Sequence, residues 1–362
     1  MATISLCMIV KDEEGILSRC LDSVNKIADE VIIIDTGSTD NTKAIASKYT
    51  KNIFDFEWID DFSAARNEAF SKATMDYILW LDADDVIEEE DYEKFMDLKE
   101  NIDLSIDSVT MNYNLAVDEY GNVAFSSRRN RLVKREKKFR WIGAVHEYLE
   151  VYGNISHSDI AITHKSISHD SDRNLNIYEN RLKEGEVFSP RDLYYFANEL
   201  LDHKMYERAA RFYEDFLDTK KGWIEDNISS CGKLADCYYY LGDREKELNS
   251  IVRSFTYGNP RSEFCCRLGY KFLDKGDTLT AIIWYKLATQ LETKKDDLGF
   301  YNPVFSTWLP HLQLCVCYDR IGNHKLAYLH NEVALKYRPN DEILLKNKEY
   351  FDSILKEEDK II

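Results

Sequence analysis

Three carboxylates stand within four residues at Asp82, Asp84 and Asp85, directly after the apolar run at residues 77–81. Carboxylates this close repel one another unless a cation lies among them. Hard divalent ions such as Mg²⁺ or Mn²⁺ prefer oxygen ligands, and they bridge carboxylates to the oxygens of a diphosphate. A solvated acidic turn that caps the following helix has the same composition, so this short motif gains its weight only from its context.

The context is a stretch of about 90 residues in which apolar strands alternate with helices. Short runs rich in β-branched and aromatic residues predict buried strands at residues 4–10, 31–35, 52–58 and 77–82. Segments with helical periodicity or capping residues lie between them. This order indicates a mostly parallel α/β sheet, in which ligands collect at the carboxyl ends of the strands. Asp35 and the Asp82–Asp85 cluster both fall at such ends.

The stretch from about 105 to 170 has a different pattern. Residues 108–117 and 154–164 alternate like half-exposed strands, and a basic patch at residues 128–140 divides them. We expect a mixed-sheet extension that completes the first domain. We expect the basic patch itself to be a solvated loop.

From Pro190 onward the sequence is helical and self-similar. Small residues recur at intervals of 38, 34 and 46 residues, at Ala197, Ala235, Gly269 and Cys315. Seven positions after each of them stand Lys204, Gly242, Gly276 and Gly322. The period resembles that of tetratricopeptide repeats, which is about 34 residues, and the alternative is an irregular helical bundle.

The composition limits the classes of partner. Asp and Glu total 65 against 47 Lys and Arg, a net charge of −18, while 44% of the residues are hydrophobic and 13% aromatic. Such a chain can bury a core, and its charge disfavours nucleic acid and anionic membrane surfaces as partners. We find no signal peptide and no membrane span, so we expect a cytoplasmic protein. The eight cysteines form no CxxC pair, and we expect them to be reduced and buried.

Four motifs in order carry a resemblance to a known family. They are CMIVKDEE at residues 7–14, IIIDTGSTDNT at 32–42, DFSAARNEA at 61–69 and LWLDADD at 79–85. The series resembles the inverting family-2 glycosyltransferases of GT-A fold, and most of all the bacterial subgroup that carries tetratricopeptide repeats after this domain. The match is dense over residues 3–90 and continues at lower density to about 165. The absence of any Gly-x-Gly excludes the phosphate loop of dinucleotide-binding domains.

The resemblance implies roles for residues at the donor site. It places Asp35 on the uracil or ribose of a sugar nucleotide. It places Arg66 near the nucleotide or diphosphate; the alternative for Arg66 is a salt bridge on the helix surface. Asp82 would lie near the ribose and the metal, and Asp84 would bind the metal directly. Lys11 and Glu13 are weaker candidates for the nucleotide pocket. Arg128, Arg129 and Arg131 lie where the family has a mobile segment covering the donor, and one of them would help to hold the diphosphate.

The resemblance also implies a metal histidine and a base. His164 fits a metal ligand downstream of the acidic motif best, while His157 and His169 lie close enough to take its place, and an ordinary strand histidine is the alternative. Glu147 is the candidate base that removes the acceptor proton. The family more often has a Glu-Asp pair here, whereas this chain has His146 before Glu147, so His146 is the other candidate.

The sequence thus predicts an α/β GT-A domain followed by an all-α repeat domain. We divide the chain into a catalytic domain at 1–172, a helical linker at 173–189, repeats at 190–345 and a charged capping helix at 346–362.

The resemblance implies an inverting glycosyltransferase that uses Mg²⁺ or Mn²⁺ and a UDP-hexose. The acceptor would be a peptide or protein, at a Cys thiol before a Ser or Thr hydroxyl, because the architecture resembles peptide S-glycosyltransferases of bacteriocin precursors. A homodimer is also implied. The alternatives are transfer to a polysaccharide or lipid-linked glycan, or a repeat scaffold with a degenerate transferase domain.

Overall fold

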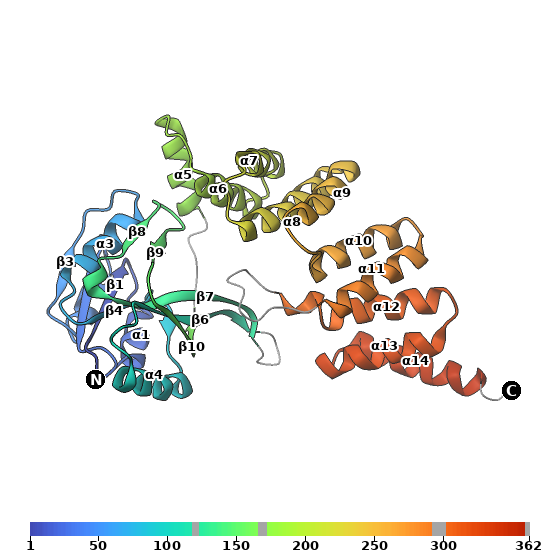
Figure 1. The fold of residues 1–362 in the computed structure, drawn as a ribbon, viewed down its shortest axis with the longest axis horizontal. Coiled ribbons are helices and arrows are strands. Elements are labelled where there is room, and N and C mark those ends of the chain that lie inside the picture. Colours follow the sequence, from blue (N-terminus) through green and yellow to red (C-terminus); the bar gives the residue numbers. More distant parts are fainter. Residues whose placement is uncertain (118–122, 166–171, 292–301, 359–362) are drawn as a thin grey trace. The chain divides into compact units, whose positions relative to one another are not determined.

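The computed structural model describes residues 1–117, 123–165, 172–291 and 302–358, which fall into two compact units, Met1–Val187 and Phe188–Ile362 (Figure 1). Helix α5 (Arg173–Lys183) lies in the range that the sequence assigns to a helical linker, and it belongs to the first unit. The candidate metal ligand His169 lies outside the described residues.

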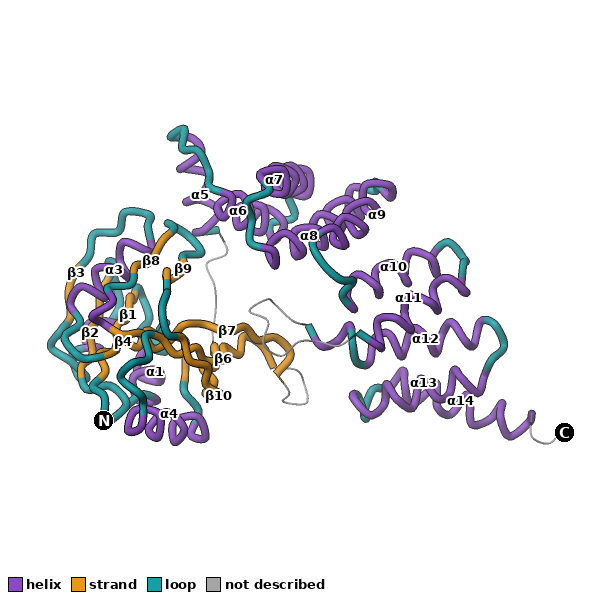
Figure 2. Tube along the Cα trace, viewed as in Figure 1, coloured by secondary structure: helices purple, strands orange, loops and turns teal. Residues whose placement is uncertain are grey.

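The first unit is built on an eight-stranded sheet with the order β3-β2-β1-β4-β7-β6-β10-β5 (Figure 2). Its strands are β1 (Ile4–Val10), β2 (Glu30–Asp35), β3 (Ile53–Asp55), β4 (Tyr77–Trp80), β5 (Asp85–Val86), β6 (Ser108–Val117), β7 (Val123–Lys134) and β10 (Ile155–His164). Strands β3, β2, β1 and β4 are parallel, β7 runs antiparallel to both β4 and β6, and β10 is parallel to β6. The predicted parallel sheet with a mixed extension is therefore confirmed.

Both faces of β1 are buried, which explains why its sequence is apolar without alternation. Helices of this unit are α1 (Leu17–Ser23), α2 (Thr42–Ala46), α3 (Phe62–Lys72) and α4 (Glu89–Asn101). Leu6 belongs to a core cluster with Leu17 of α1 and Phe95 of α4. Cys7 points to the opposite face, in a second cluster with Ala69 of α3. Helices on both faces thus hold the strand ends in fixed positions.

The basic patch is not a solvated loop, and that expectation was wrong. Residues 128–134 belong to β7, between β4 and β6 in the sheet, and Arg131 is fully buried there. The patch continues through a short turn into β8 (Arg140–Ile142), which pairs with β9 (Tyr148–Glu150) in a two-stranded sheet. The strand forms because the arginines find partners: Arg128 donates to the Thr110 hydroxyl at 3.1 Å, and Arg131 donates to a carboxylate.

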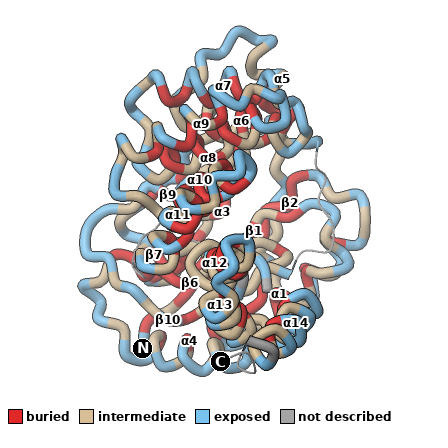
Figure 3. Tube along the Cα trace, turned by 90° about the vertical axis from the view of Figure 1, so that its right-hand side faces the viewer, coloured by how far each residue is buried: buried red, intermediate tan, exposed pale blue. Residues whose placement is uncertain are grey.

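In the described part of the second unit, consecutive helices pack in four pairs, followed by one final helix, and buried residues (red) lie along the helices (Figure 3). The helices are α6 (Pro190–Asp202), α7 (Tyr206–Thr219), α8 (Ile224–Leu241), α9 (Arg244–Arg253), α10 (Ser262–Asp274), α11 (Thr278–Gln290), α12 (Trp308–Arg320), α13 (His324–Tyr337) and α14 (Glu342–Glu358). The predicted helical repeats are confirmed. The final helix begins at Glu342, four residues before the predicted capping helix.

The aligned repeat positions have the same structural role in each pair. Gly242, Gly276 and Gly322 all have φ between 75° and 80°, the left-handed conformation that ends the first helix of a pair. Lys204 takes the same conformation, with φ of 59°, at the equivalent place in the first pair. At the preceding small position, the Cβ of any larger residue in place of Gly269 would lie 2.7 Å from the Tyr285 ring. The glycines therefore mark turns and one close helix contact.

All eight cysteines are free and buried, as expected. Among the residues that the structure describes, no helix combines the length and the apolar character needed to cross a bilayer.

Candidate active site

The candidate residues converge because β1, β2 and β4 are parallel neighbours. Val10 lies opposite Asp35 in the register of β1 and β2, so the loops after these strands begin side by side. The two loops bind each other: Asp12 accepts from the backbone N–H of Thr39 at 2.7 Å, and Glu14 accepts from that of Asn41 at 3.0 Å. The turn after β4 lies at the same edge. This edge is where an open α/β sheet binds ligands.

Asp35 is prepared to accept a hydrogen bond from a ligand. Its side chain is 1% exposed, and Oδ1 accepts from the backbone N–H groups of Gly37 and Ser38 at 3.1 and 3.0 Å. Its Oδ2 is buried without a hydrogen-bond partner among the described residues. A buried acceptor without a donor is costly, so a ligand N–H or hydroxyl that reached it would relieve that cost.

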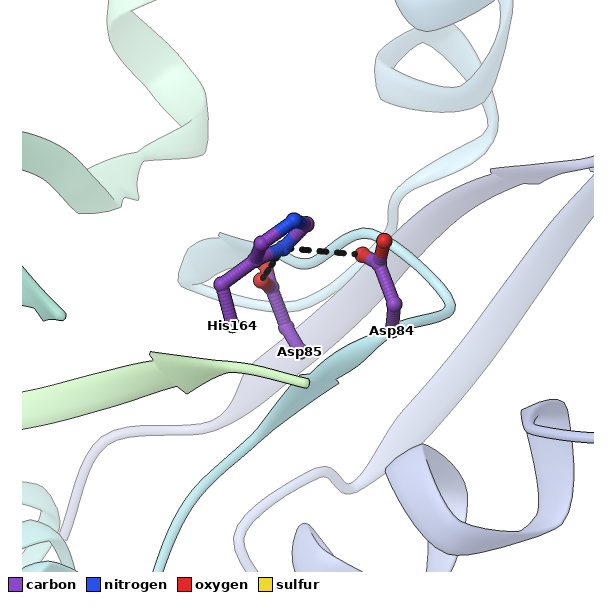
Figure 4. Close-up of side chains that lie close together, drawn as sticks. All are labelled: Asp84, Asp85 and His164. Atoms are coloured by element: carbon purple, nitrogen blue, oxygen red, sulfur yellow. Dashed lines mark ion pairs between the residues drawn. The ribbon is translucent and has the colours of Figure 1, made fainter. Parts of the chain in front are cut away.

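Asp84, Asp85 and His164 form a cluster whose donor atoms all lie within 4.8 Å of one another (Figure 4). The Nδ1 atom of His164 lies 3.3 Å from Asp84 Oδ1 and 3.7 Å from Asp85 Oδ1. Pairing of β10 with β5 sets His164 opposite Asp85. The carboxylates of Asp84 and Asp85 raise the pKa of His164 to about 10.

This cluster fits a divalent cation. Asp85 Oδ1 is buried and accepts no hydrogen bond within the described part of the chain, and it faces the histidine beside Asp84. Two carboxylate oxygens and one imidazole nitrogen are a mixed donor set that suits Mn²⁺ and, with more oxygen from a ligand, Mg²⁺. Asp82 lies next to this cluster in sequence, but its carboxylate is 2.7 Å from the guanidinium of Arg66.

Arg66 connects the acidic motif to the candidate base. Its Nη2 donates to Asp82 at 2.7 Å and its Nε donates to Glu147 at 2.5 Å. The guanidinium lies 5.2 and 4.9 Å from the ring centres of Trp80 and Trp141. Since Arg66 is 9% exposed, the surface salt bridge is ruled out for this residue.

The electrostatics keep Asp82 and Arg66 charged. Burial raises the pKa of Asp82, but the charges of Arg66 and Arg131 outweigh it and hold the pKa of that carboxyl below its ordinary value. Burial likewise lowers the pKa of Arg66, and Asp82 and Glu147 raise it by more. The result is a buried guanidinium, that of Arg66, held between the carboxyl groups of Asp82 and Glu147.

The segment that carries Glu147 is positioned by the residue after Arg66. Asn67 donates to the carbonyl of Trp141 and accepts from its N–H, both at 2.9 Å, which fixes β8 against α3. The chain then turns through Gly143, with φ of 103°, and His146, with φ of 50°, before β9. Asn67 thus positions the segment that carries Glu147 by binding the backbone of Trp141.

Two other predicted pocket residues differ in their surroundings. Glu13 is half-buried, and burial together with the charge of Asp84 raises its pKa to about 7. Its backbone N–H donates to the Thr42 hydroxyl at 2.7 Å. Lys11 is exposed at the start of the same loop.

The remaining candidates lie away from the cluster or in other contacts. His157 accepts from or donates to the Thr110 hydroxyl through Nδ1, at 2.7 Å, between β6 and β10. Arg128 is bound to Thr110 and to the Ser158 carbonyl, and Arg129 is half-buried in β7 with contacts of its own.

The sequence indicates Asp85 only as a member of the acidic cluster, without a role of its own, and it favours a solvated loop for Arg131. Both side chains are 0% exposed, and Arg131 Nη1 donates to Asp85 Oδ2 at 2.9 Å and to the Trp80 carbonyl at 3.2 Å. The only hint in the sequence is that Arg131 stands directly before Leu132 and Val133, an apolar pair typical of a buried strand.

The comparisons with known proteins agree with this architecture. The family model "Glycosyl transferase family 2" matches residues 5–148. The N-terminal domain is a family-2 glycosyltransferase domain. The match spans β1 to the residue after Glu147, so it includes every donor-site residue discussed above except His164.

Relatives of this family-2 domain carry matching names. A TPR repeat-containing protein of Synechococcus elongatus is 41% identical over 150 residues, which are 41% of this chain and 36% of that protein. The SPbeta prophage-derived glycosyltransferase SunS of Bacillus subtilis is 29% identical over 218 residues, 55% of this chain and 49% of SunS. The chain therefore spans about half, or less, of the length of these curated relatives.

Solved structures of low identity match about half of the chain. The crystal structure of MamA is 14% identical, with a TM-score of 0.39, over 47% of this chain and 90% of MamA. Part of a TPR repeat-containing protein from Cytophaga hutchinsonii is also 14% identical, with a TM-score of 0.42, over 52% of this chain and 68% of that one.

Proposed function

We propose that this protein is a cation-dependent inverting glycosyltransferase that moves a hexose from a UDP-sugar to a peptide or protein. One observation carries the proposal. At a single edge of a family-2 domain, a buried carboxylate oxygen of Asp35 without a donor stands at the end of β2, and Asp84 and Asp85, which follow β4, meet His164 at the end of β10. The first would accept from the nucleoside, and the second would meet the diphosphate.

The donor would be held by the strand-end loops. Asp35 Oδ2 would accept from the uracil N–H or a ribose hydroxyl, and Glu13 would line the same pocket from the neighbouring loop. A Mg²⁺ or Mn²⁺ ion bound at Asp84 and His164 would stabilise the charge that develops on the leaving diphosphate. Arg66 holds Asp82 in place beside this position.

The acceptor would attack the anomeric carbon in one displacement. The bond from the acceptor sulfur or oxygen to that carbon forms as the bond to the diphosphate oxygen breaks, which inverts the configuration. The acceptor proton passes to Glu147, with His146 as the other candidate. Arg66 keeps the Glu147 carboxylate oriented at 2.5 Å. A Cys thiol, with an ordinary pKa of about 8.5, demands less of this base than a hydroxyl does.

The helical repeats would bind the acceptor, because stacked helix pairs form extended concave surfaces. We also propose that the chain forms a homodimer in the cytoplasm. Light scattering on the purified chain measures this directly, and a monomer mass at micromolar concentration would contradict it.

A donor screen tests the proposed chemistry. We expect UDP-hexoses with Mn²⁺ to raise the melting temperature and to be hydrolysed slowly without an acceptor. Larger stabilisation by a GDP- or dTDP-sugar than by every UDP-sugar would contradict the uridine assignment. If no nucleotide sugar binds or turns over, the chain is a repeat scaffold with a degenerate transferase domain. Mass spectrometry of Cys and Ser peptides after incubation then tests the acceptor.

A further inference from the structure

We infer that Asp85, held by the buried Arg131, is a direct ligand of the cation, and that Asp82 is not. This inference rests on the proposed function, since it concerns the cation of that reaction. It assigns Asp85 a role that the acidic motif alone does not give it. It also makes Arg131 a positioning residue of the site.

The Asp85 carboxylate has one oxygen that accepts hydrogen bonds and one that accepts none from the described residues. Its two oxygens have different surroundings, although the side chain is 0% exposed. Oδ2 accepts from Arg131 Nη1 at 2.9 Å and from the backbone N–H of Asp82 at 3.0 Å. Oδ1 is buried and accepts no hydrogen bond from any described residue. It points toward His164 beside Asp84 (Figure 4), so the oxygen without a donor is the one in the cluster.

The Asp82 carboxylate, in contrast, is already bound to Arg66. Its Oδ1 lies 2.7 Å from Arg66 Nη2, and the same guanidinium binds Glu147. The described residues whose donor atoms converge are Asp84, Asp85 and His164, without Asp82. Asp82 Oδ1 would have to leave its charge-assisted bond to Arg66 to bind the cation, whereas Asp85 keeps its bond to Arg131 through Oδ2 and presents Oδ1.

Arg131 and two aromatic rings form a framework behind Asp85. Arg131 lies with its guanidinium 3.8 Å from the ring centre of Trp80 and 4.4 Å from that of Tyr113. The Tyr113 hydroxyl lies 3.0 Å from His164 Nδ1. The arginine therefore fixes the carboxylate, and the same aromatic wall contacts the histidine. Arg131 thus holds Oδ2 of Asp85 and leaves Oδ1 as an oxygen ligand of the kind that a hard cation prefers.

Binding of Mn²⁺ to the full-length chain tests this inference without measuring turnover. Free Mn²⁺ is followed by its electron paramagnetic resonance signal, with the metal alone and with UDP added. Asp85→Asn leaves Arg131 buried without its partner and endangers folding, so the double variant D85N/R131M carries the test. Asp107→Asn is the matched control, because Asp107 is a buried carboxylate that accepts from the Asn154 N–H, next to the other end of β10.

We expect D85N/R131M and Asp84→Asn to weaken Mn²⁺ binding at least about tenfold, the usual effect of losing a ligand or its support. Asp82→Asn should change it less than about threefold, since only a nearby charge is lost, and Asp107→Asn should leave it unchanged. Thermal melts confirm that each variant is folded.

Two results would overturn the inference while the proposed function stands. One is wild-type affinity in D85N/R131M, and the other is a loss in Asp82→Asn as large as that in Asp84→Asn. If the unaltered chain binds no Mn²⁺ with or without UDP, the cation dependence of the proposed function fails as well.

Discussion

At the scale of single residues, the site depends on arginines that the fold buries. The sequence identifies Asp35, Arg66 and Asp84 because they stand in motifs at strand ends and helix starts. It does not reveal that Arg66 joins Asp82 to Glu147, a residue 81 positions away. Such pairings depend on the packing of α3 against β8. The hydrophobic period of either segment does not reveal that the two segments contact each other.

We predict that Arg66→Lys lowers turnover on the order of 10²-fold, because a single ammonium cannot hold both carboxylates in the geometry of the planar fork. Steady-state rates with saturating donor measure this change. Arg140→Lys, at an exposed position of β8, is the control and should behave like the unaltered chain. Turnover of Arg66→Lys within twofold of the unaltered chain would contradict the bridging role.

At the scale of elements, strands and helices were predictable wherever the hydrophobic period of the local sequence matches the burial of the element in the fold. Strands β1 and β2 and helix α3 form where the sequence predicts them. The exceptions have a tertiary cause. Strand β7 carries arginines that local hydropathy assigns to a solvated loop, and they become tolerable in a sheet only because Asp85 and Thr110 accept their hydrogen bonds.

In the repeats, Gly269→Ala should destabilise the second unit by about 1–3 kcal/mol. The added Cβ would lie 2.7 Å from the Tyr285 ring, which packs α11 against α10. Gly258→Ala is the matched control, because its Cβ would meet nothing within 4 Å. Denaturant melts compare the free energies of unfolding of the two variants. Equal values would show that α10 and α11 accommodate the added methyl group without loss of stability.

Helix α8 provides a pH-dependent prediction. Burial raises the pKa of Asp226 from 3.8 to about 6. The folded state thus favours the protonated form, so the stability from this group is full below pH 3.8 and is lost as the pH rises through about 6. Asp226→Asn should therefore stabilise the chain at pH 7.5 by on the order of 2 kcal/mol. The gain should shrink toward pH 4. Thermal melts at both pH values measure it, and a loss of stability at pH 7.5 would contradict this assignment.

At the scale of the whole molecule, the sequence predicts an α/β unit followed by helical repeats, and both are present. The charge of −18 at first disfavours an anionic substrate. The cluster of Asp84, Asp85 and His164 changes that interpretation, because acidic groups at one point can recruit the cation that a diphosphate needs.

Because each unit has its own core, we predict two thermal transitions in calorimetry. UDP with Mn²⁺ should raise only the transition of the first unit, since a ligand stabilises the unit that binds it. Asp84→Asn should abolish this shift and leave the other transition unchanged. A single transition that moves as a whole with the ligand would contradict independent units.

The most direct test of the proposed function is hydrolysis of a UDP-hexose with Mn²⁺ by the unaltered chain and by Asp84→Ala. Asp84 Oδ1 lies 3.3 Å from His164 Nδ1, and the alanine removes the proposed cation ligand without filling the space. We predict turnover by the unaltered chain that requires Mn²⁺, and a loss on the order of 10²-fold or more in the variant. Equal turnover by both proteins would contradict a cation-dependent transferase at this site.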